Sequence, residues 1–256
     1  MTLCIVGAGE MGRWLAGAVD TELAFADTDA NAARAAAETF DAEMVPLANG
    51  TPERDRRFEA VCLAVPMPTV ADAVADWAPY TERAMFDLSG VMTPAVEAMR
   101  ERLPNRERAS IHPLFAPARA PGNVAVVADE VGETLNPLLS ALRSAGNNLF
   151  ETTPDEHDEA MSTVQAKTHA AVLAWALAAD DVREEFHTPV SAGLADLATT
   201  VTEGDAHVYD DIQRQFDGAK ALAEAAERVA AAGGEEFAAL YAEAGAAAEA
   251  LGGESE

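Results

Sequence analysis

The chain has 256 residues, which is long enough for one large domain or two ordinary ones, each with a sizeable hydrophobic core. Its 44 acidic and 17 basic residues give a formal net charge of −27, which excludes charge-driven binding to nucleic acid or to an anionic membrane surface. The N-terminus has no basic leader before an apolar run, and no apolar run approaches the roughly 20 residues of a membrane span. We therefore expect a cytoplasmic protein.

The acidic composition also bears on the solvent in which the protein works. Only Lys167 and Lys220 are lysines, and alanine is abundant. Such a chain repels itself strongly unless concentrated salt screens its charges. This pattern favours a halophilic protein; the alternative is an ordinary acidic cytosolic protein. The two cysteines, Cys4 and Cys62, fall in predicted strands, so we expect buried apolar side chains and no disulfide framework.

The chain opens with a predicted strand, a tight turn and a helix. The apolar run 2–6 is followed by Gly7-Ala-Gly-Glu-Met-Gly12, after which apolar residues recur at helical spacing to Val19. A G-x-G-x-x-G pattern in this context is typical of a dinucleotide site, where the second glycine leaves room for a pyrophosphate at the helix N-terminus. The candidate cofactor-binding residues of the turn are Gly7, Ala8, Gly9, Glu10, Met11 and Gly12.

An acidic residue ends the second predicted strand. Asp27 closes the run 23–27 and lies twenty residues after Gly7. A carboxylate at this place accepts hydrogen bonds from the adenine ribose and repels a 2′-phosphate, which favours NAD over NADP. The alternative is that Asp27 caps the helix that begins near Asn31 or belongs to an acidic surface.

Strands and helices then alternate along the first half of the chain, as in a doubly wound parallel sheet of the Rossmann type. We predict a polar surface loop over 48–57 between the third and fourth strands. The further predicted strands are 43–47, 60–65, 84–87, 109–112, 124–127 and 149–152, and the helices are 31–42, 69–77, 94–103 and 133–144.

The composition changes beyond Pro154, where Ala, Glu and Leu recur at helical spacing. We predict helices at 154–182, 190–202, 205–232 and 234–251, with a frayed end over 252–256. The fold class is therefore α/β: an N-terminal doubly wound Rossmann-type sheet over 1–153, followed by an all-helical domain over 154–256.

Ligands of open α/β sheets bind beyond the carboxyl ends of the strands. Val65 ends one predicted strand and Pro66 follows it; both are assigned to the cofactor site, and Ser89 follows the next strand. His112 ends a further strand, where a neutral imidazole can take a proton from a substrate hydroxyl while hydride leaves the same carbon. A hydrogen-bonded structural histidine is the alternative.

The first helix of the second half carries polar residues among Ala, Val and Leu. Gln165 and His169 are four residues apart and so share a face, with Lys167 nearby; the alternative is a solvated face. We expect His157 to help the helix begin and not to react. The histidines and cysteines show no metal-ligand spacing, so we predict no metal site.

The sequence resembles the prephenate and arogenate dehydrogenase family of tyrosine biosynthesis. The resemblance rests on the glycine turn, 63–66, 87–91, 111–114 and 156–158 leading into 164–169. It implies an NAD-binding domain followed by a helical substrate domain through which two subunits pair. It also implies oxidative decarboxylation of prephenate or arogenate, with His112 at the substrate hydroxyl and His169 in the substrate pocket; with Ser89, these are the candidate catalytic residues.

Two departures from the family pattern concern charge. Members often have Gly-Ser-Val-Lys where this chain has Ser89-Gly-Val-Met92, and a substrate-binding arginine of the family corresponds to Thr200. A dianionic substrate needs a cation, and Arg119 and Lys167 are our candidates, with Gln165 as a further substrate-binding residue. Two other functions stay open: a β-hydroxyacid or imine reductase that depends on Lys167, and a non-catalytic relative that binds NAD(H).

Overall fold

A computed structural model describes residues 1–53 and 56–252. It divides into a sheet unit, Met1–Met161, and a helical unit, Ser162–Glu256, which are described separately. We predicted a boundary after Thr153; the division after Met161 leaves the first two turns of the following helix with the sheet unit. Residues 253–256 of the predicted frayed end, and residues 54–55 of the predicted loop, lie outside the described residues.

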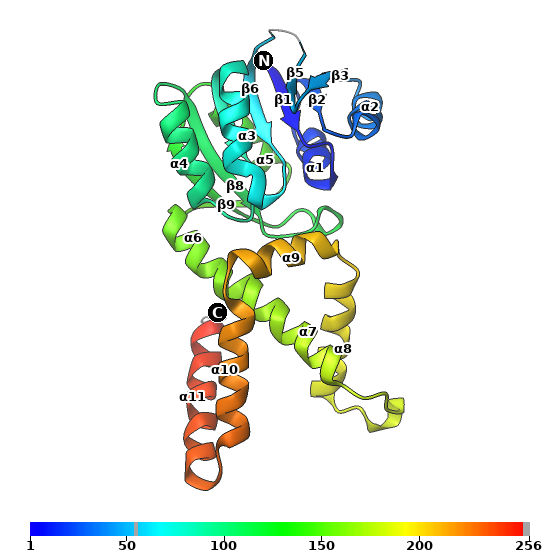
Figure 1. The fold of residues 1–256 in the computed structure, drawn as a ribbon, viewed down its shortest axis with the longest axis vertical. Coiled ribbons are helices and arrows are strands. Elements are labelled where there is room, and N and C mark those ends of the chain that lie inside the picture. The colour runs from blue at the N-terminus through cyan, green and yellow to red at the C-terminus, as the bar shows by residue number, and fades with distance from the viewer. Residues whose placement is uncertain (54–55, 253–256) are drawn as a thin grey trace. The chain divides into compact units, whose positions relative to one another are not determined.

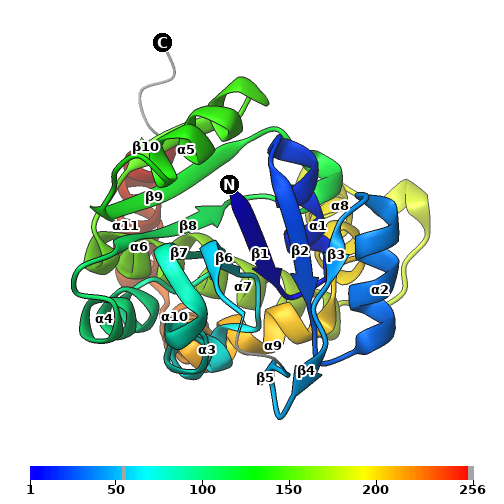
Figure 2. The same cartoon turned by 90° about the horizontal axis from the view of Figure 1, so that it is seen from above.

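An eight-stranded sheet forms the sheet unit, in the order β10-β9-β8-β7-β6-β1-β2-β3 (Figure 2). Its strands are β1 (Thr2–Val6), β2 (Glu22–Ala26), β3 (Glu43–Met44), β6 (Phe58–Leu63), β7 (Thr81–Asp87), β8 (Glu107–Pro113), β9 (Asn123–Glu130) and β10 (Asn148–Glu151). These are the predicted strands with small changes of bounds. The strand predicted over 43–47 is shorter in the structure, where it ends at Met44.

Helices cover both faces of this sheet, which confirms the doubly wound architecture. The helices are α1 (Glu10–Ala18), α2 (Ala30–Thr39), α3 (Val70–Trp77), α4 (Thr93–Arg102), α5 (Leu135–Ser144) and α6 (Pro154–Met161) (Figure 1). Alternate strand residues belong to two separate core clusters: one includes residues of α1, α2 and α5, and the other includes residues of α3 and α4. Cys4 and Cys62 are buried and free, as expected.

The sheet is not wholly parallel, because the last two strands, β9 and β10, run opposite to the strands before them. β8 and β9 pair antiparallel, because a loop with one 3-10 turn, Pro117–Arg119, joins them in place of a crossover helix. β10 then runs parallel to β9. In this register His112, near the carboxyl end of β8, lies opposite Ala125 near the start of β9.

The predicted surface loop 48–57 contains a small hairpin. β4 (Leu47–Ala48) pairs antiparallel with β5 (Thr51–Pro52), and the turn between them has Asn49 and Gly50 at positive φ. An Asn-Gly pair is well suited to such a turn, because both residues tolerate positive φ. Residues 48–52 of the predicted surface loop therefore belong to a hairpin, whose first strand begins at Leu47.

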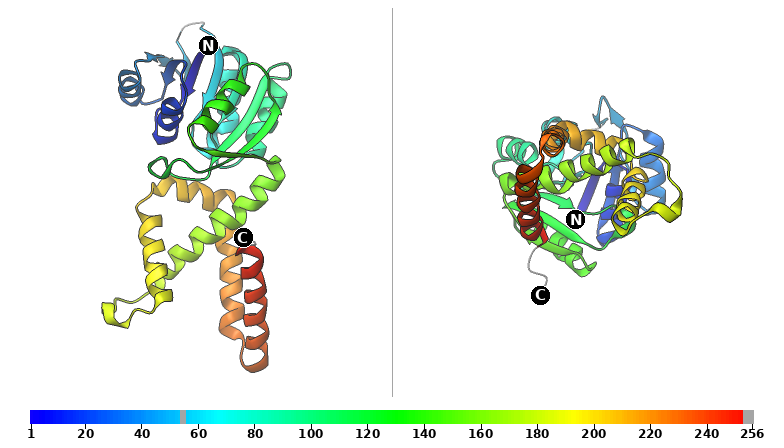
Figure 3. Two further views of the ribbon diagram at one scale, coloured as in Figure 1. Left: turned by 180° about the vertical axis from the view of Figure 1, so that it is seen from behind. Right: turned by 90° about the horizontal axis from the view of Figure 1, so that it is seen from below.

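The helical unit contains α7 (Thr168–Ala178), α8 (Pro189–Thr202), α9 (Ala206–Gln215), α10 (Gly218–Ala231) and α11 (Gly234–Gly252) (Figures 1 and 3). The helix predicted over 154–182 is interrupted, because Ser162–Lys167 forms a π-helical segment before α7. The helix predicted over 205–232 is two helices. Phe216 is extended between them, and Gly218 approaches Ala166 so closely that a Cβ there would lie 2.5 Å from its carbonyl carbon.

None of the described helices is long and apolar enough to span a bilayer.

Candidate active site

The glycine turn between β1 and α1 has the geometry that its sequence predicts. Gly7 has φ +105°, and a Cβ on it would lie 2.0 Å from the Ala64 carbonyl oxygen. A Cβ on Gly12 would lie 2.1 Å from the Gly7 carbonyl oxygen, so helix and strand pack too closely for a side chain. A Cβ on Gly9 would meet nothing within 4 Å. Two glycines are thus needed for packing, whereas Gly9 borders open space at the start of α1.

Asp27 faces this turn from the end of β2. Its carboxylate accepts hydrogen bonds from the backbone N–H of Ala8, at 2.7 Å, and of Asp29, at 2.8 Å. The capping residue of α2 is Asp29, whose side chain accepts from the N–H of Asn31. Asp27 therefore joins the glycine turn to the strand end and is not the cap of α2. Its proposed contact with a ribose stays a prediction.

Arg13 is a residue of this region that the sequence analysis missed. Its Nε donates to the Ala8 carbonyl oxygen at 2.8 Å, and its guanidinium also donates to the carbonyl oxygen of Ala32 in α2 at 3.2 Å. The side chain thus fixes the start of α1 against α2. An arginine directly after the third glycine is the only signal in the sequence that could have indicated this contact.

Residues after β6 and β7 lie at the carboxyl edge as predicted. Val65 is half-buried and Pro66 is exposed, directly after β6. Ser89 is buried after β7, where its hydroxyl accepts from the Val91 N–H and its own N–H donates to Asp87. Gly90 of this turn approaches His112, since a Cβ on it would lie 3.6 Å from Nε2 of that histidine.

A chain of three polar side chains begins at His112. Nδ1 of His112 is 2.9 Å from Nε2 of His157, and Nδ1 of His157 is 2.8 Å from Oδ1 of Asp158. Asp158 also accepts from the backbone N–H groups of Met92 and Thr93, at 2.9 and 3.0 Å. We expected His157 only to help α6 begin. The structure instead buries it against His112, to 3% exposure.

Burial determines the charge of His112. It lowers the pKa of this imidazole to about 3, and the positive charge on a protonated His157 would lower it further, while Asp158 opposes the shift. His112 is therefore neutral at neutral pH, which is the state that a general base requires.

Asp87 is a second unusual group beneath this edge. Its side chain is fully buried at the end of β7, and Oδ1 accepts from the Ser89 N–H and the Ser110 hydroxyl. Oδ2 has no hydrogen-bond partner among the described residues. Burial raises the pKa of Asp87 to about 7, although the hydrogen bonds from Ser89 and Ser110 oppose the shift.

The predicted substrate residues of the helical unit lie in its π-helical segment or just after it, at the start of α7. The amide of Gln213, in α9, donates to the carbonyl oxygen of Ala166 at 2.9 Å, which partly satisfies the irregular backbone there. Gln165 Oε1 and His169 Nδ1 are buried and have no partner in the described part of the chain. Burial lowers the pKa of His169, whose ring lies edge-on to Tyr209 at 4.7 Å between centroids.

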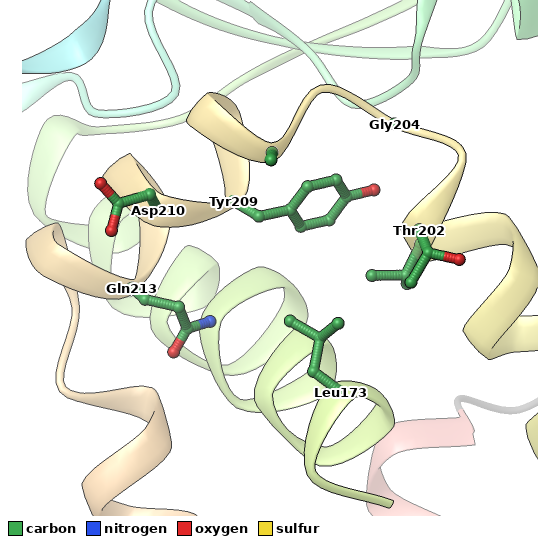
Figure 4. Close-up of a pocket in the computed structure, with 8 residues that line it drawn as sticks. Leu173, Thr202, Gly204, Tyr209, Asp210 and Gln213 are labelled. Carbon is green, nitrogen blue, oxygen red and sulfur yellow. The ribbon is translucent and has the colours of Figure 1, made fainter. Parts of the chain in front are cut away.

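A cavity of about 340 Å³ lies in the same unit, between α7, α8 and α9 (Figure 4). It is lined by Leu173, Val201, Thr202, Gly204, Ala206, Tyr209, Asp210 and Gln213. Tyr209 links this cavity to His169, because its ring both lines the cavity and contacts the imidazole. No Lys or Arg is among the lining residues.

The two basic residues predicted to bind the substrate, Lys167 and Arg119, have exposed side chains. Lys167 is exposed, and its Nζ donates to the Thr163 hydroxyl at 3.2 Å. Arg119 is exposed at the end of the 3-10 turn between β8 and β9. Thr200, at the position of the family arginine, is exposed on α8 and donates to the Asp196 carbonyl oxygen.

Comparison with known proteins identifies the family. No protein-family model matches the chain. The 4-amino-4-deoxyprephenate dehydrogenase of Streptomyces pristinaespiralis is 32% identical over 206 residues, which cover 72% of this chain and 69% of that protein. This chain belongs to the prephenate and arogenate dehydrogenase family. It is therefore an oxidoreductase, as the sequence predicts.

Solved structures agree with this assignment at the level of the fold. A prephenate dehydrogenase from A. aeolicus, in complex with hydroxyphenyl propionate and NAD⁺, is 16% identical with a TM-score of 0.66, over 89% of this chain and 87% of that one. Synechocystis arogenate dehydrogenase is 17% identical with a TM-score of 0.59, over 96% and 98%. A Rossmann-type sheet followed by helices is thus confirmed for this member of the family.

The glycine turn provides a first test, with two glycines as a matched pair. Gly9→Ala adds a methyl group in open space, so we expect a thermal midpoint close to that of the unmodified protein and weaker NAD binding. Gly7→Ala places a Cβ against a backbone oxygen at positive φ, so we expect lost stability or failure to fold. Calorimetric titration and thermal melts measure both. Unchanged NAD affinity in Gly9→Ala would contradict the assigned pyrophosphate site.

Asp87 predicts a pH-dependent stability. Its pKa of about 7 in the folded protein exceeds the ordinary value of 3.8, so the folded state holds its proton more tightly. The stabilisation is complete below about pH 4 and is lost as pH rises through about 7, on the order of 1.4 kcal/mol per unit of pKa difference. Asp87→Asn should remove this part of the pH dependence.

The measurement is the free energy of unfolding against pH in concentrated KCl, where surface charges are screened. Asp72→Asn, which changes an exposed carboxylate on α3, is the control. If the curves of Asp87→Asn and the unmodified protein are parallel between pH 4 and 7, Asp87 ionises normally.

Proposed function

We propose that this chain is an NAD-dependent dehydrogenase that oxidatively decarboxylates prephenate or arogenate, giving 4-hydroxyphenylpyruvate or tyrosine. The observation that carries the proposal is His112, a neutral buried imidazole at the carboxyl end of a sheet strand, in a unit that also has an open dinucleotide turn. Membership of the family supports the reaction class.

The residues present fit the cofactor. The start of α1 presents backbone N–H groups beside Gly9, where no side chain intrudes. Asp27, which is hydrogen-bonded to the Ala8 N–H of the same turn, would accept hydrogen bonds from the adenine ribose. Glu10, Met11, Val65 and Pro66 would border the same cofactor. NAD supplies the acceptor for the hydride that leaves C4 of the substrate ring.

His112 then has a defined task. Its Nε2 accepts the proton of the C4 hydroxyl as the carbon becomes a ketone, and this ketone makes loss of the ring carboxylate favourable because the ring becomes aromatic. The roles of Ser89 and His169 near the substrate, and of Gln165, Lys167 and Arg119 in binding it, stay predictions. Lys167 and Arg119 are exposed, so each would need to approach the substrate from the surface.

A variant substrate has specific support. The relative from Streptomyces pristinaespiralis is named for 4-amino-4-deoxyprephenate, which carries an amine where prephenate carries a hydroxyl. A neutral imidazole can accept a proton from either group. We therefore include this compound as a third candidate substrate.

The experiment offers prephenate, arogenate and 4-amino-4-deoxyprephenate separately to the purified protein with NAD or NADP, in molar KCl, and follows the absorbance of the reduced cofactor. Turnover of one compound with a preference for NAD is the expected result. Protein that binds NAD but oxidises none of the three would favour a reductase or a non-catalytic relative.

His112→Asn tests the base directly. We expect turnover to fall by about 10²–10⁴-fold with little change in NAD affinity, because only the proton acceptor is removed. His187→Asn, at an exposed position, is the control. Equal turnover in His112→Asn would remove this residue from the mechanism, and loss of activity in Lys167→Met alone would favour the reductase alternative.

We also propose that the protein is a cytoplasmic homodimer adapted to concentrated salt. The helical unit exposes most of the large apolar side chains that lie on the surface of the single chain, which supports burial against a second copy. They are Val164, Leu177, Val182, Phe186, Val190, Leu197, Val208, Val229, Phe237, Tyr241 and Leu251. The net charge of −27 would oppose such an association unless salt screened it.

Salt therefore should control assembly and activity together. We expect a dimer and full turnover in molar KCl, and dissociation with loss of turnover in dilute buffer. Light scattering and the dehydrogenase assay at matched protein concentrations measure both. A dimer of unchanged activity in dilute buffer would indicate an ordinary acidic protein.

A further inference from the structure

Asp158 determines where the protons of the two histidines lie. Burial opposes its ionisation, but hydrogen bonds from His157 and from the backbone of Met92 and Thr93 lower its pKa below the ordinary value. An ionised carboxylate can only accept hydrogen bonds. Nδ1 of His157, 2.8 Å away, therefore carries a hydrogen.

The same reasoning extends to His112. In a neutral His157 with its hydrogen on Nδ1, Nε2 has a free electron pair, which faces Nδ1 of His112 at 2.9 Å. A hydrogen bond at this distance requires the hydrogen to be on Nδ1 of His112. Nε2 of His112 is then unprotonated, and the lack of a side chain at Gly90 leaves the space beside it free of a Cβ.

We propose that His157 and Asp158 form with His112 a buried proton relay, in which a proton taken by Nε2 of His112 is matched by transfer of its Nδ1 proton to His157, beside Asp158. The proposal rests on the proposed function, since that function brings a substrate hydroxyl or amine to Nε2. His157 and Asp158 are positioning residues, which act on the substrate only through His112.

The proton balance of the reaction suits a relay of this kind. The O–H bond at C4 breaks, an N–H bond forms on Nε2 of His112, and the Nδ1 proton of His112 passes to Nε2 of His157. The C4 hydride leaves to NAD, and the oxygen becomes a ketone. When the bond to the ring carboxylate breaks, CO₂ leaves, the electron pair enters the ring, and the protons return so that the oxygen becomes a phenol. No net proton is released, so the relay needs no path to solvent.

The relay also explains how a base in this environment can work. Burial makes a positive charge on His112 costly, as its pKa of about 3 indicates. Transfer of the second proton moves the charge to His157, whose Nδ1 is already hydrogen-bonded to the Asp158 carboxylate. A charge beside an opposite charge is far cheaper to bury than an isolated one.

The first test needs no substrate. Two-bond ¹H–¹⁵N correlation spectra of protein labelled with ¹⁵N-histidine, recorded at neutral pH, report which ring nitrogens carry hydrogen. The spectra of His112→Asn and His157→Gln assign the signals. We expect both histidines to be neutral with hydrogen on Nδ1. Hydrogen on Nε2 of His112, or a doubly protonated His112, would overturn the proposal.

The second test separates proton transfer from positioning. His157→Gln retains an oxygen that can accept from Nδ1 of His112 but cannot take up a proton. We expect the rate of hydride transfer in a single turnover to fall by about 10²-fold, with NAD affinity, thermal midpoint and the His112 tautomer retained. His207→Gln, at an exposed position, is the control. A rate in His157→Gln within about threefold of the unmodified enzyme would overturn the relay.

The two tests also separate this proposal from the proposed function. If the unmodified protein oxidises none of the three candidate substrates, the proposed function fails. The NMR spectra still decide whether the hydrogen-bonded chain exists as described.

Discussion

The hydrogen bonds that Asp158 accepts are the interaction on which the candidate site depends. One carboxylate holds the first backbone N–H groups of α4 and the ring of His157, and His157 in turn holds His112. This carboxylate therefore ties α6 to the sheet unit. It also explains why the sheet unit continues to Met161, beyond the last strand. The base and the groups that orient it thus belong to one compact body.

Local patterns in the sequence were sufficient for much of the fold. The glycine turn, the buried strands and the alternation of strand and helix are properties of short segments, and the structure has them. The reversal of β9 is not such a property, because it depends on how the loop after His112 returns to the sheet. The π-helical segment was hidden for a similar reason, since its irregular carbonyl is bound by Gln213, 47 residues further along the chain.

In the candidate site, too, local patterns predicted some residues and contacts between distant residues decided others. His112 could be predicted because it ends a strand and precedes proline, at the edge where such sheets bind ligands. His157 could not, because its role depends on contact with a residue 45 positions away. Its helix begins with an acidic first turn, a pattern that by itself indicates only a helix start. The adjacent Asp158 was part of the family resemblance, but only the structure gives it a physical task.

Buried titratable groups give the carboxyl edge of the sheet its chemical character. Burial keeps His112 neutral and holds a proton on Asp87 up to about neutral pH, while hydrogen bonds keep Asp158 ionised. A neutral base and a fixed negative charge, separated by one imidazole, can accept a proton for the duration of a reaction and return it.

The most direct measurement of the central claim follows the hydride itself. Substrate deuterated at C4 would be incubated with the protein and NAD, and the reduced cofactor and the product would be analysed by mass spectrometry. The account predicts one deuterium in the reduced nicotinamide, none on the aromatic ring, and one CO₂ released for each cofactor reduced. Reduced cofactor without deuterium, or reduction without release of CO₂, would contradict it.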